Sequence, residues 1–377
     1  MAEPGQSSPA AVSSDEAKLE ELRERIDAID AVLLEQLNER AQRVREVGRL
    51  KHLRRTPVYV AGRETAIVER LRRENRGPFP DAGVAPVFRE IISATRSLEA
   101  EVRIAYLGPG GTFCHLAASR QFGDLSDLQS VPSIADVFAA VGRGKVDLGI
   151  VPVENSTTGV VTETLDAFSE FDVTVCGEAV LEVSQTLLSQ SGKLEDVRRV
   201  ASHPQPLAQC REWLNRHLAD VERVETASTA AAAQLAVKDA GVAAIASSMA
   251  GRVYGLRAIE EAIEDRADNS TRFLILSREA PAAGAHDLTS VVFTIRKDEA
   301  GALFRLLEPF ARCGINLTSI QQRPMKGKPW EYLFFVDLEG NRDQPRVEEA
   351  LKAAEDVATS VRVLGSFPRA ASVGGEN

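Results

Sequence analysis

The chain has 377 residues, of which 44% are hydrophobic and 27% charged, and its formal net charge is −10. A chain of this length is too long for one hydrophobic core and predicts two to four domains. The acidic excess argues against nucleic acid or an anionic membrane surface as a general partner. No run approaches the roughly 18 apolar residues of a membrane span.

Residues 1–15 lack a basic segment followed by an apolar core, so we expect a disordered tail there rather than an export signal. The four cysteines are far apart and form no CxxC pair, and the five histidines are equally scattered. The sequence therefore predicts no metal site built on Cys and His, and it favours the reducing cytoplasm.

Residues 16–101 have a helical pattern. Apolar residues recur at spacings of three, four and seven in the first predicted helix: Leu22, Ile26, Ile29, Leu33, Leu37, Val44 and Val47. This helix has about thirty residues or more and ends before Pro57. A second helix covers about 63–73 and a third about 85–101. They cannot bury the first helix's apolar stripe alone, so we expect an all-α homodimer with intertwined helices.

Arg40 and Lys51 share a face of the first helix, because they lie eleven residues apart, or about three turns. Two cations beside an apolar stripe are costly unless an anion meets them. The alternative is snorkelling or salt bridges between helices. Polar groups on the next two helices can face the same pocket: Arg63, Glu64, Thr95 and Glu99. An acid such as Glu64 is also favoured in the first turn of any helix.

The segments LRERIDAIDAVLLEQLNERAQRVREVGRLK, TPVYVAGRE and FREIISATRSLE resemble the all-helical chorismate mutase domain. Chorismate mutases convert chorismate to prephenate in a one-step pericyclic rearrangement. The protein therefore need only hold the reactive conformer of chorismate and stabilise the charge that develops at its ether oxygen. The resemblance implies that Arg40, Lys51 and Glu99 are catalytic. It also implies that the dianion chorismate is bound by Arg23 of the other subunit, Arg63, Glu64 and Thr95.

Two residues depart from the mutase pattern. Val60 stands where the pattern usually has Asp, and Glu99 where many members have Gln. A Glu can donate a hydrogen bond to the ether oxygen only when protonated. We therefore expect mutase activity to be favoured at mildly acidic pH. A helical domain that has lost the activity is the alternative.

Residues 102–280 alternate strands with helices, which predicts an α/β architecture with parallel sheets, in one sheet or two lobes. Polar groups follow four predicted strands: the turn GPGGT, then Glu154, Asn155 and Ser156, then Ser202, His203 and Gln205, then Ser228 and Thr229. Open α/β sheets bind ligands at such strand ends, although Asn and Ser also cap helices. The Gly-rich turn is not a GxGxxG fingerprint, so no nicotinamide cofactor is expected.

A last strand in this region begins with Thr271, Arg272 and Phe273. An Arg at the head of a buried strand either reaches water at an edge or holds a carboxylate. With the four polar strand ends, this triplet resembles prephenate dehydratase, which folds as two lobes like the periplasmic binding proteins. The resemblance implies that Arg272 binds a prephenate carboxylate and Thr271 acts on the departing hydroxyl. Glu154 and His203 are alternative aids to the proton transfer, and Phe273 is expected to pack.

We expect residues 281–289 to form a linker and residues 370–377 a tail. Between them, residues 290–369 have the predicted element order β-α-β-β-α-β, which is typical of a ferredoxin-like fold. The segments GALF and QQRP resemble the phenylalanine motifs of ACT domains. The resemblance implies a phenylalanine site made of Gly301, Ala302, Leu303, Phe304, Asn316, Leu317, Gln321, Gln322, Arg323 and Pro324. The family usually has Glu-Ser where this chain has Gln321 and Gln322, so the strength and sign of regulation stay open. A purely structural dimerisation module is the alternative.

Together the resemblances imply a bifunctional chorismate mutase/prephenate dehydratase that makes phenylpyruvate without a metal or organic cofactor. The expected partners are chorismate, prephenate, phenylalanine as effector, and at least one further copy of the chain. Neither nucleic acid nor a membrane is expected. Two alternatives are a monofunctional dehydratase with a non-catalytic helical domain and a non-catalytic sensor of aromatic ligands.

Overall fold

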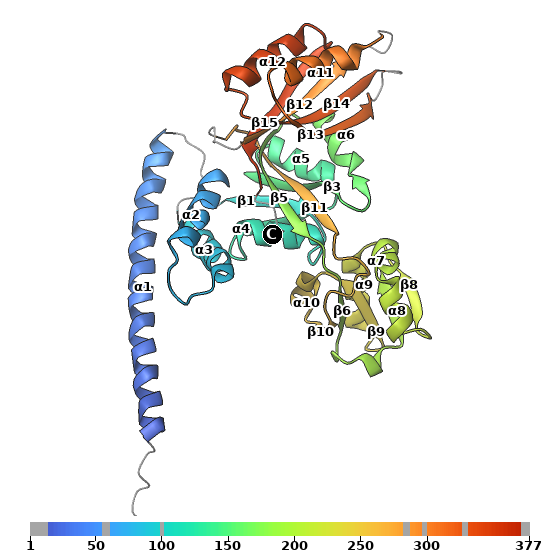
Figure 1. Cartoon of the computed structure of the whole chain (residues 1–377). Coiled ribbons are helices and arrows are strands. Elements are labelled where there is room, and N and C mark those ends of the chain that lie inside the picture. Colours follow the sequence, from blue (N-terminus) through green and yellow to red (C-terminus); the bar gives the residue numbers. More distant parts are fainter. Residues whose placement is uncertain are drawn as a thin grey trace, which may run out of the picture.

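The computed structural model describes residues 14–54, 61–98, 102–281, 287–295, 300–325 and 331–370 (Figure 1). Along the chain it shows a helical unit, a two-lobed α/β unit, and a C-terminal unit of one sheet and two helices. In these described parts, no helix is both long enough and apolar enough to cross a bilayer.

The helical unit consists of α1 (Ser14–Arg54), α2 (Ala61–Glu74) and α3 (Asp81–Arg96), which confirms the three predicted helices. α3 begins at Asp81, about four residues before the predicted start, because the buried Val84 packs its first turn against the core. α1 has 41 residues and stands apart from the rest of the chain along most of its length (Figure 1). Its apolar stripe is therefore exposed: Leu22 by 47%, Ile26 by 56%, Ile29 by 58% and Leu33 by 56%.

The α/β unit forms two lobes, each with its own sheet. Lobe 1 has the strand order β2-β1-β3-β11-β5, with β4 against β3. Its elements are β1 (Arg103–Leu107), α4 (Phe113–Phe122), β2 (Asp127–Val131), α5 (Ile134–Gly142), β3 (Leu148–Asn155), β4 (Gly159–Val160), α6 (Thr162–Glu170), β5 (Thr174–Glu182) and β11 (Ser270–Ser277).

Lobe 2 has the strand order β10-β6-β9-β7-β8. Its elements are β6 (Thr186–Ser189), a 3-10 turn (Leu194–Asp196), β7 (Arg199–Ser202), α7 (Pro204–Gln209), α8 (Arg211–His217), β8 (Glu222–Glu225), α9 (Thr229–Lys238), β9 (Val242–Ala246), α10 (Ser248–Tyr254) and β10 (Arg257–Glu260). The two lobes are connected by β5, which leaves lobe 1, and β11, which returns to it (Figure 1).

The prediction of parallel sheets was wrong in part, because both sheets are mixed. β1 is parallel to β2 and β3, but β11 is antiparallel to β3 and β5, and β6 is antiparallel to β9. The reason is the double crossing between lobes, since a chain that leaves and returns along neighbouring strands makes them antiparallel. Four strands were missed: β2 and β10 are mostly exposed and give no apolar run, and β4 and β6 have only two and four residues.

The C-terminal unit has a four-stranded antiparallel sheet in the order β13-β14-β12-β15. Its elements are β12 (Asp287–Ile295), α11 (Ala302–Arg312), β13 (Leu317–Pro324), β14 (Tyr332–Glu339), α12 (Pro345–Glu355) and β15 (Ser360–Pro368). The predicted alternation of strands and helices is confirmed. β12 begins at Asp287, inside the range predicted as linker, because Leu288 pairs with both neighbouring strands.

The C-terminal sheet and lobe 1 share one hydrophobic core. Phe138, Phe168 and Leu274 of lobe 1 pack in the same cluster as Phe335 and Phe367 of the C-terminal unit. At Gly365 of β15 the two units approach closely, because an added Cβ would lie 2.0 Å from the carbonyl oxygen of Val175 in β5. The backbones of β15 and β5 are thus in direct contact, so a displacement of one sheet must displace the other.

Candidate active sites

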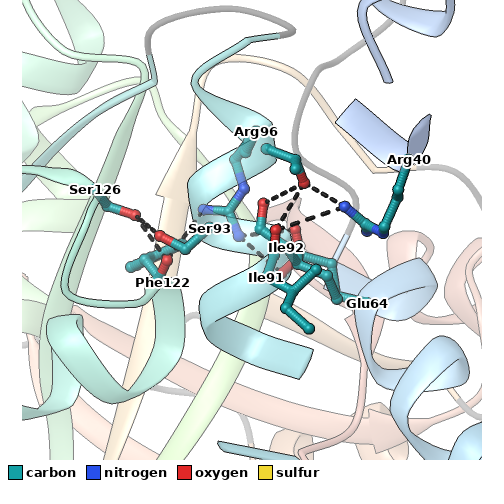
Figure 2. A network of polar contacts seen from close by, with 9 residues as sticks. Arg40, Glu64, Ile91, Ile92, Ser93, Arg96, Phe122 and Ser126 are labelled. Carbon is teal, nitrogen blue, oxygen red and sulfur yellow. Dashed lines mark hydrogen bonds and ion pairs between the residues drawn. The ribbon is translucent and has the colours of Figure 1, made fainter. Parts of the chain in front are cut away.

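The first candidate site lies where the three helices of the helical unit meet (Figure 2). Arg40 of α1 donates to the Thr95 hydroxyl of α3 and, at 3.5 Å, to the Ile91 carbonyl. Thr95 donates to the same carbonyl at 2.7 Å, so its hydroxyl oxygen accepts from Arg40. Burial lowers the pKa of Arg40, and the Glu64 carboxylate opposes that effect. The structure thus brings Arg40, Glu64 and Thr95 together.

Arg96 completes this cluster, and the sequence analysis did not identify it. Its Nη2 lies 2.9 Å from both carboxylate oxygens of Glu64, and its side chain is only 6% exposed. Its guanidinium also lies 6.0 Å from the centre of the Phe122 ring of α4. A basic residue in the last turn of a helix is common and gives little signal. Arg96 therefore connects the helical cluster to lobe 1.

The other predicted mutase residues are not part of this cluster in one chain. Arg23 is exposed and pairs with Glu20 at 3.4 Å. It precedes Arg40 by about 25 Å along α1, at 1.5 Å per residue, so it cannot reach the same chain's cluster. Arg63 is exposed at the start of α2. The Lys51 side chain, Val60 and Glu99 lie outside the residues that the structure describes.

The second candidate site lies at the edge of the lobe 1 sheet, where β3 ends beside the start of β11. Asn155, the last residue of β3, is paired with Thr271 and is 8% exposed. Its Nδ2 donates to the Thr271 hydroxyl oxygen at 2.9 Å and to Asn269 Oδ1 at 2.7 Å. Its Oδ1 accepts from the backbone N–H groups of Thr157 and Thr158 at 3.1 and 3.0 Å.

These contacts fix which way the Asn155 amide points. A backbone N–H can only donate, so the atom facing Thr157 and Thr158 is the oxygen, and the atom facing Thr271 is the nitrogen. Because the Thr271 oxygen accepts from Asn155, the hydroxyl proton of Thr271 is left to donate to another group. Donation to a hydroxyl oxygen also strengthens that hydroxyl as a donor. The pair is therefore arranged to present a hydroxyl proton at the sheet edge.

Glu154 and Arg272 lie on the opposite face of the sheet. They are paired across β3 and β11 one position beyond the Asn155–Thr271 pair, and side chains alternate between faces along a strand. Both line a small cavity, about 30 Å³ in volume, between lobe 1 and the C-terminal unit. The expectation that Glu154 aids Thr271 directly therefore does not fit the structure, because the sheet separates the two side chains.

Arg272 is engaged by two carboxylates. Its Nε donates to Glu178 at 2.7 Å and its Nη1 to Asp337 at 2.6 Å, with only 19% of its side chain exposed. Burial alone would lower the pKa of Arg272, but Asp337 and Glu178 raise it above its ordinary value. The guanidinium is thus a buried cation directed at the C-terminal unit. Phe273, the third residue of the triplet, is 1% exposed in the lobe 1 core.

The Gly-rich turn lies at the same sheet edge as Asn155, since β1 and β3 are parallel neighbours. Gly111 has a φ of 85°, and an added Cβ would lie 2.9 Å from the Tyr254 ring of lobe 2. Ser247 of lobe 2 donates to the Gly111 carbonyl at 2.8 Å. His115 accepts from the Gly111 N–H at 3.1 Å, and burial lowers its pKa, which favours the neutral imidazole. His115 was not among the site residues expected from the sequence.

The predicted lobe 2 residues have structural contacts of their own. Ser202 is fully buried and donates to the Ile245 carbonyl at 2.7 Å. His203 accepts from the Gln205 N–H at 3.3 Å, and Ser228 caps α9 by accepting from the Ala231 N–H at 3.0 Å. In the described part of the chain, no hydrogen bond joins these side chains or Thr229 to the Asn155–Thr271 pair.

The residues of the predicted effector site lie on α11 and β13. Gly301 precedes α11 with a φ of 76°, and Phe304 is 72% exposed. Side chains alternate along β13, so Gln322 and Pro324 are exposed while Gln321 and Arg323 are half-buried. Arg323 binds Asp166 of α6 through both carboxylate oxygens at 3.0 Å. The remaining members differ in burial: Ala302 is buried, Leu317 is half-buried, and Leu303 and Asn316 are exposed.

Metal ligands are not grouped in the described residues, because no three His, Cys, Asp or Glu side chains there could hold one ion. The fold and the two sites define a class of protein: a multidomain enzyme with a helical domain, a two-lobed α/β domain and a small regulatory-type domain. Family models agree with this division. They match chorismate mutase type II over residues 22–100, prephenate dehydratase over 104–281 and the ACT domain over 289–356.

Relatives match the chain over nearly its whole length. The bifunctional chorismate mutase/prephenate dehydratase of Aquifex aeolicus is 44% identical over 94% of this chain and 98% of its own length. A solved prephenate dehydratase from Arthrobacter aurescens in complex with L-Phe is 34% identical, with a TM-score of 0.66 over 71% of this chain and 90% of that one. A solved quorum quenching acylase also has a TM-score of 0.66, at 28% identity over 71% of this chain and 97% of that one. The chain belongs to the bifunctional chorismate mutase/prephenate dehydratase family.

Proposed function

We propose that this protein rearranges chorismate to prephenate in its helical domain and converts prephenate to phenylpyruvate in its two-lobed domain. The observation that carries the proposal is the Asn155–Thr271 pair at the sheet edge, in a chain that matches bifunctional relatives from end to end. The first product is the second substrate, so both activities in one chain make chemical sense. We place the protein in the cytoplasm, which the four unpaired cysteines support.

The dehydratase step needs the substrate held and one proton delivered. Prephenate loses CO₂, and the electron pair of that bond enters the ring while the C–OH bond breaks and the ring becomes aromatic. The Thr271 hydroxyl, oriented by Asn155, donates to the departing oxygen, which leaves as water. Solvent supplies the net proton. Glu154 takes no direct part, because it lies on the other face of the sheet.

Substrate binding at this sheet edge is assigned by residue type and position. The N–H groups at the start of α4, after the Gly-rich turn, suit a carboxylate of prephenate. Ser156 lies at the end of β3, and lobe 2 contributes four further side chains in our proposal: His203, Gln205, Ser228 and Thr229. Ser202 is left as a structural contact, because its hydroxyl is fully buried. Arg272 is not given a carboxylate of the substrate, since it already binds two carboxylates of the protein.

The mutase step needs cations around a dianion and a donor at the ether oxygen. Arg40, with Thr95 as its acceptor, supplies one cation in each chain. We propose that Lys51 and Arg63 add charge to the same pocket, that Glu99 is the donor, and that Arg23 comes from a second copy. The exposed apolar stripe of α1 supports such an intertwined dimer, because water is a poor environment for a stripe of this length.

The C-terminal domain is assigned to phenylalanine regulation. Its strand order matches a ferredoxin-like fold, and the matched ACT model and the solved relative bound to L-Phe support the effector. We propose that the ligand binds at the start of α11 and beside β13, through the motif residues Gly301–Phe304 and Gln321–Pro324. Gly301 suits this role, because a glycine there lets a ligand approach the backbone.

The direct test compares the wild type with Thr271→Val, which keeps the shape of the side chain and removes the hydroxyl. We expect the variant to lose about 100-fold or more of its turnover of prephenate, as is typical for a lost general acid. Its turnover of chorismate should be unchanged, which controls for folding. A variant with wild-type dehydratase activity would remove Thr271 from the mechanism. A wild type that turns over neither compound but binds phenylalanine would favour the sensor instead.

A further inference from the structure

Arg272 connects the catalytic strand β11 to the C-terminal domain. It follows Thr271 directly in the chain, and its side chain crosses to the opposite face of the sheet. There it binds Glu178 of β5 and Asp337 of β14, the second of which belongs to the ACT domain. The three side chains are 19%, 5% and 14% exposed. We call these residues, Arg272, Glu178 and Asp337, the ion triad.

Both carboxylates of the ion triad accept a hydrogen bond from the C-terminal domain. Glu178 accepts from the backbone N–H of Ala370 through its second oxygen at 2.8 Å, and Asp337 accepts from the Ser290 hydroxyl of β12 through its own second oxygen. Each carboxylate therefore has one oxygen for Arg272 and one for the C-terminal domain. A buried carboxylate that loses its cation is strongly disfavoured, so the position of Asp337 constrains that of Arg272.

The phenylalanine motif lies beside the ion triad. β13 pairs with β14 so that Ser319 is opposite Asp337 and Gln321 is opposite Phe335. Ser319 and Gln321 also line the small cavity that contains Arg272 and Asp337. The next inward residue of the motif, Arg323, binds Asp166 of α6. A ligand that moves β13 therefore acts on side chains that contact the catalytic domain.

The backbone of β3 is irregular beside this point. Its register with β11 shifts between Arg272 and Phe273, because Val153 of β3 has no partner there, whereas β11 stays in register with β5 from Ser270 to Ile275. On the β3 side, Thr271 and Arg272 are therefore positioned by their side-chain contacts as well as by the ladder. Asn155 holds Thr271 on one face, and Asp337 with Glu178 holds Arg272 on the other.

We propose that Asp337 of the ACT domain is a positioning residue for the dehydratase reaction: by fixing Arg272 it sets the position of Thr271, and the effect of phenylalanine on this reaction passes through the same ion triad. The proposal rests on the proposed dehydratase function. It assigns Arg272 to positioning rather than to contact with the substrate.

The experiment compares Asp337→Asn with Asp172→Asn in the full-length protein. Asp172 pairs with Arg362 at 3.1 Å across the same domain interface, its side chain is fully exposed, and no hydrogen bond or ion pair joins it to β11 in the described residues, so it controls for the loss of an interface ion pair outside the ion triad. For each protein, kcat and KM for prephenate, turnover of chorismate, calorimetric binding of phenylalanine and the melting temperature are measured. The change in dehydratase rate on adding phenylalanine is recorded with its sign.

We expect Asp337→Asn to lower kcat for prephenate at least tenfold with KM changed less than threefold. Its chorismate turnover should be unchanged, and phenylalanine should still bind while its effect on the dehydratase rate falls at least threefold. Asp172→Asn should match the wild type. Arg272→Lys should lower kcat by the same factor. The double variant Asp337→Asn/Arg272→Lys should have a kcat no lower than that of the poorer single variant, because each change disrupts the same ion triad.

Equal kcat values for Asp337→Asn and Asp172→Asn, or a full phenylalanine effect in Asp337→Asn, would overturn the proposal. If Asp337→Asn does not fold, Ser290→Ala replaces it, because it removes only the hydrogen bond to Asp337. A kcat lowered two- to fivefold is then expected, and an unchanged kcat would count against the proposal. A wild type that leaves prephenate unchanged would instead refute the dehydratase function.

Discussion

The substitution Asn155→Asp separates the chemical role of Asn155 from its structural role. Asn155 donates to Thr271, Asn269 and the Ser270 carbonyl, and its oxygen accepts from Thr157 and Thr158. An aspartate keeps the accepting oxygen for the turn and replaces the donor with an anion. The Thr271 hydroxyl must then donate to the new carboxylate, and its proton is withheld from the departing oxygen of the substrate.

The size of the effect follows from the hydrogen bond that is reversed. A hydrogen bond to a charged group is worth about 1.5–3 kcal/mol. Each 1.36 kcal/mol changes a rate tenfold, so kcat for prephenate should fall about 10- to 150-fold. Asn155→Ala should in addition destabilise the fold by about 2–6 kcal/mol, because it leaves two N–H groups of the turn without their acceptor at about 1–3 kcal/mol each.

The assay follows phenylpyruvate formation from added prephenate, with chorismate turnover as the internal control. The melting temperature shows whether loss of rate comes from loss of fold. We expect Asn155→Asp to melt closer to the wild type than Asn155→Ala does, while both lose dehydratase activity. If Asn155→Asp keeps the wild-type kcat, the reasoning about the direction of the Asn155–Thr271 hydrogen bond is refuted.

Four further predictions concern the helical unit and the domain interface. Ile29→Asp changes a side chain that is 58% exposed in one chain, so the monomer should still fold. The variant should lose mutase activity, and light scattering should show half the wild-type mass, because the dimer through α1 is broken. An unchanged mass would contradict this dimer. Glu99→Gln should raise mutase activity at neutral pH and remove its acid preference, and a flat pH profile for both proteins would refute the role of Glu99. Arg96→Met breaks the ion pair with Glu64, whose two side chains are 6% and 24% exposed. Denaturant titration should show a free energy of unfolding about 3 kcal/mol lower than that of the wild type. An unchanged free energy of unfolding would show that the pair does not stabilise the fold. Gly365→Ala places a Cβ 2.0 Å from the Val175 carbonyl and should lower the melting temperature, whereas the control Gly77→Ala meets nothing within 4 Å and should not.

The sequence predicted the elements that have strong periodicity. The apolar spacing predicted the helix α1, and the β-α-β-β-α-β order predicted the elements of the C-terminal unit; the structure has both. The strands β2 and β10 were missed because their residues are mostly exposed, and β4 and β6 because they are only two and four residues long. The antiparallel return of β11 was also missed, since it depends on the path between the lobes and not on any local pattern.

The candidate sites were predictable as sets of residues but not as contacts. Asn155 and Thr271 are 116 positions apart, and only the register of β3 with β11 joins them. That same register puts Glu154 and Arg272 on the opposite face, which residue types cannot reveal. Asp337 and Glu178 gave no sequence signal, because an acid in a strand reads as an exposed residue until the facing cation is known.

The measurement that tests the central claim most directly is a cofactor-free assay of the full-length protein with chorismate, in which prephenate and phenylpyruvate are followed separately. The account predicts that prephenate appears first and phenylpyruvate follows, and that Thr271→Val stops the reaction at prephenate. Turnover of added prephenate without any turnover of chorismate would contradict the claim of two activities, and the helical domain would then be a structural unit.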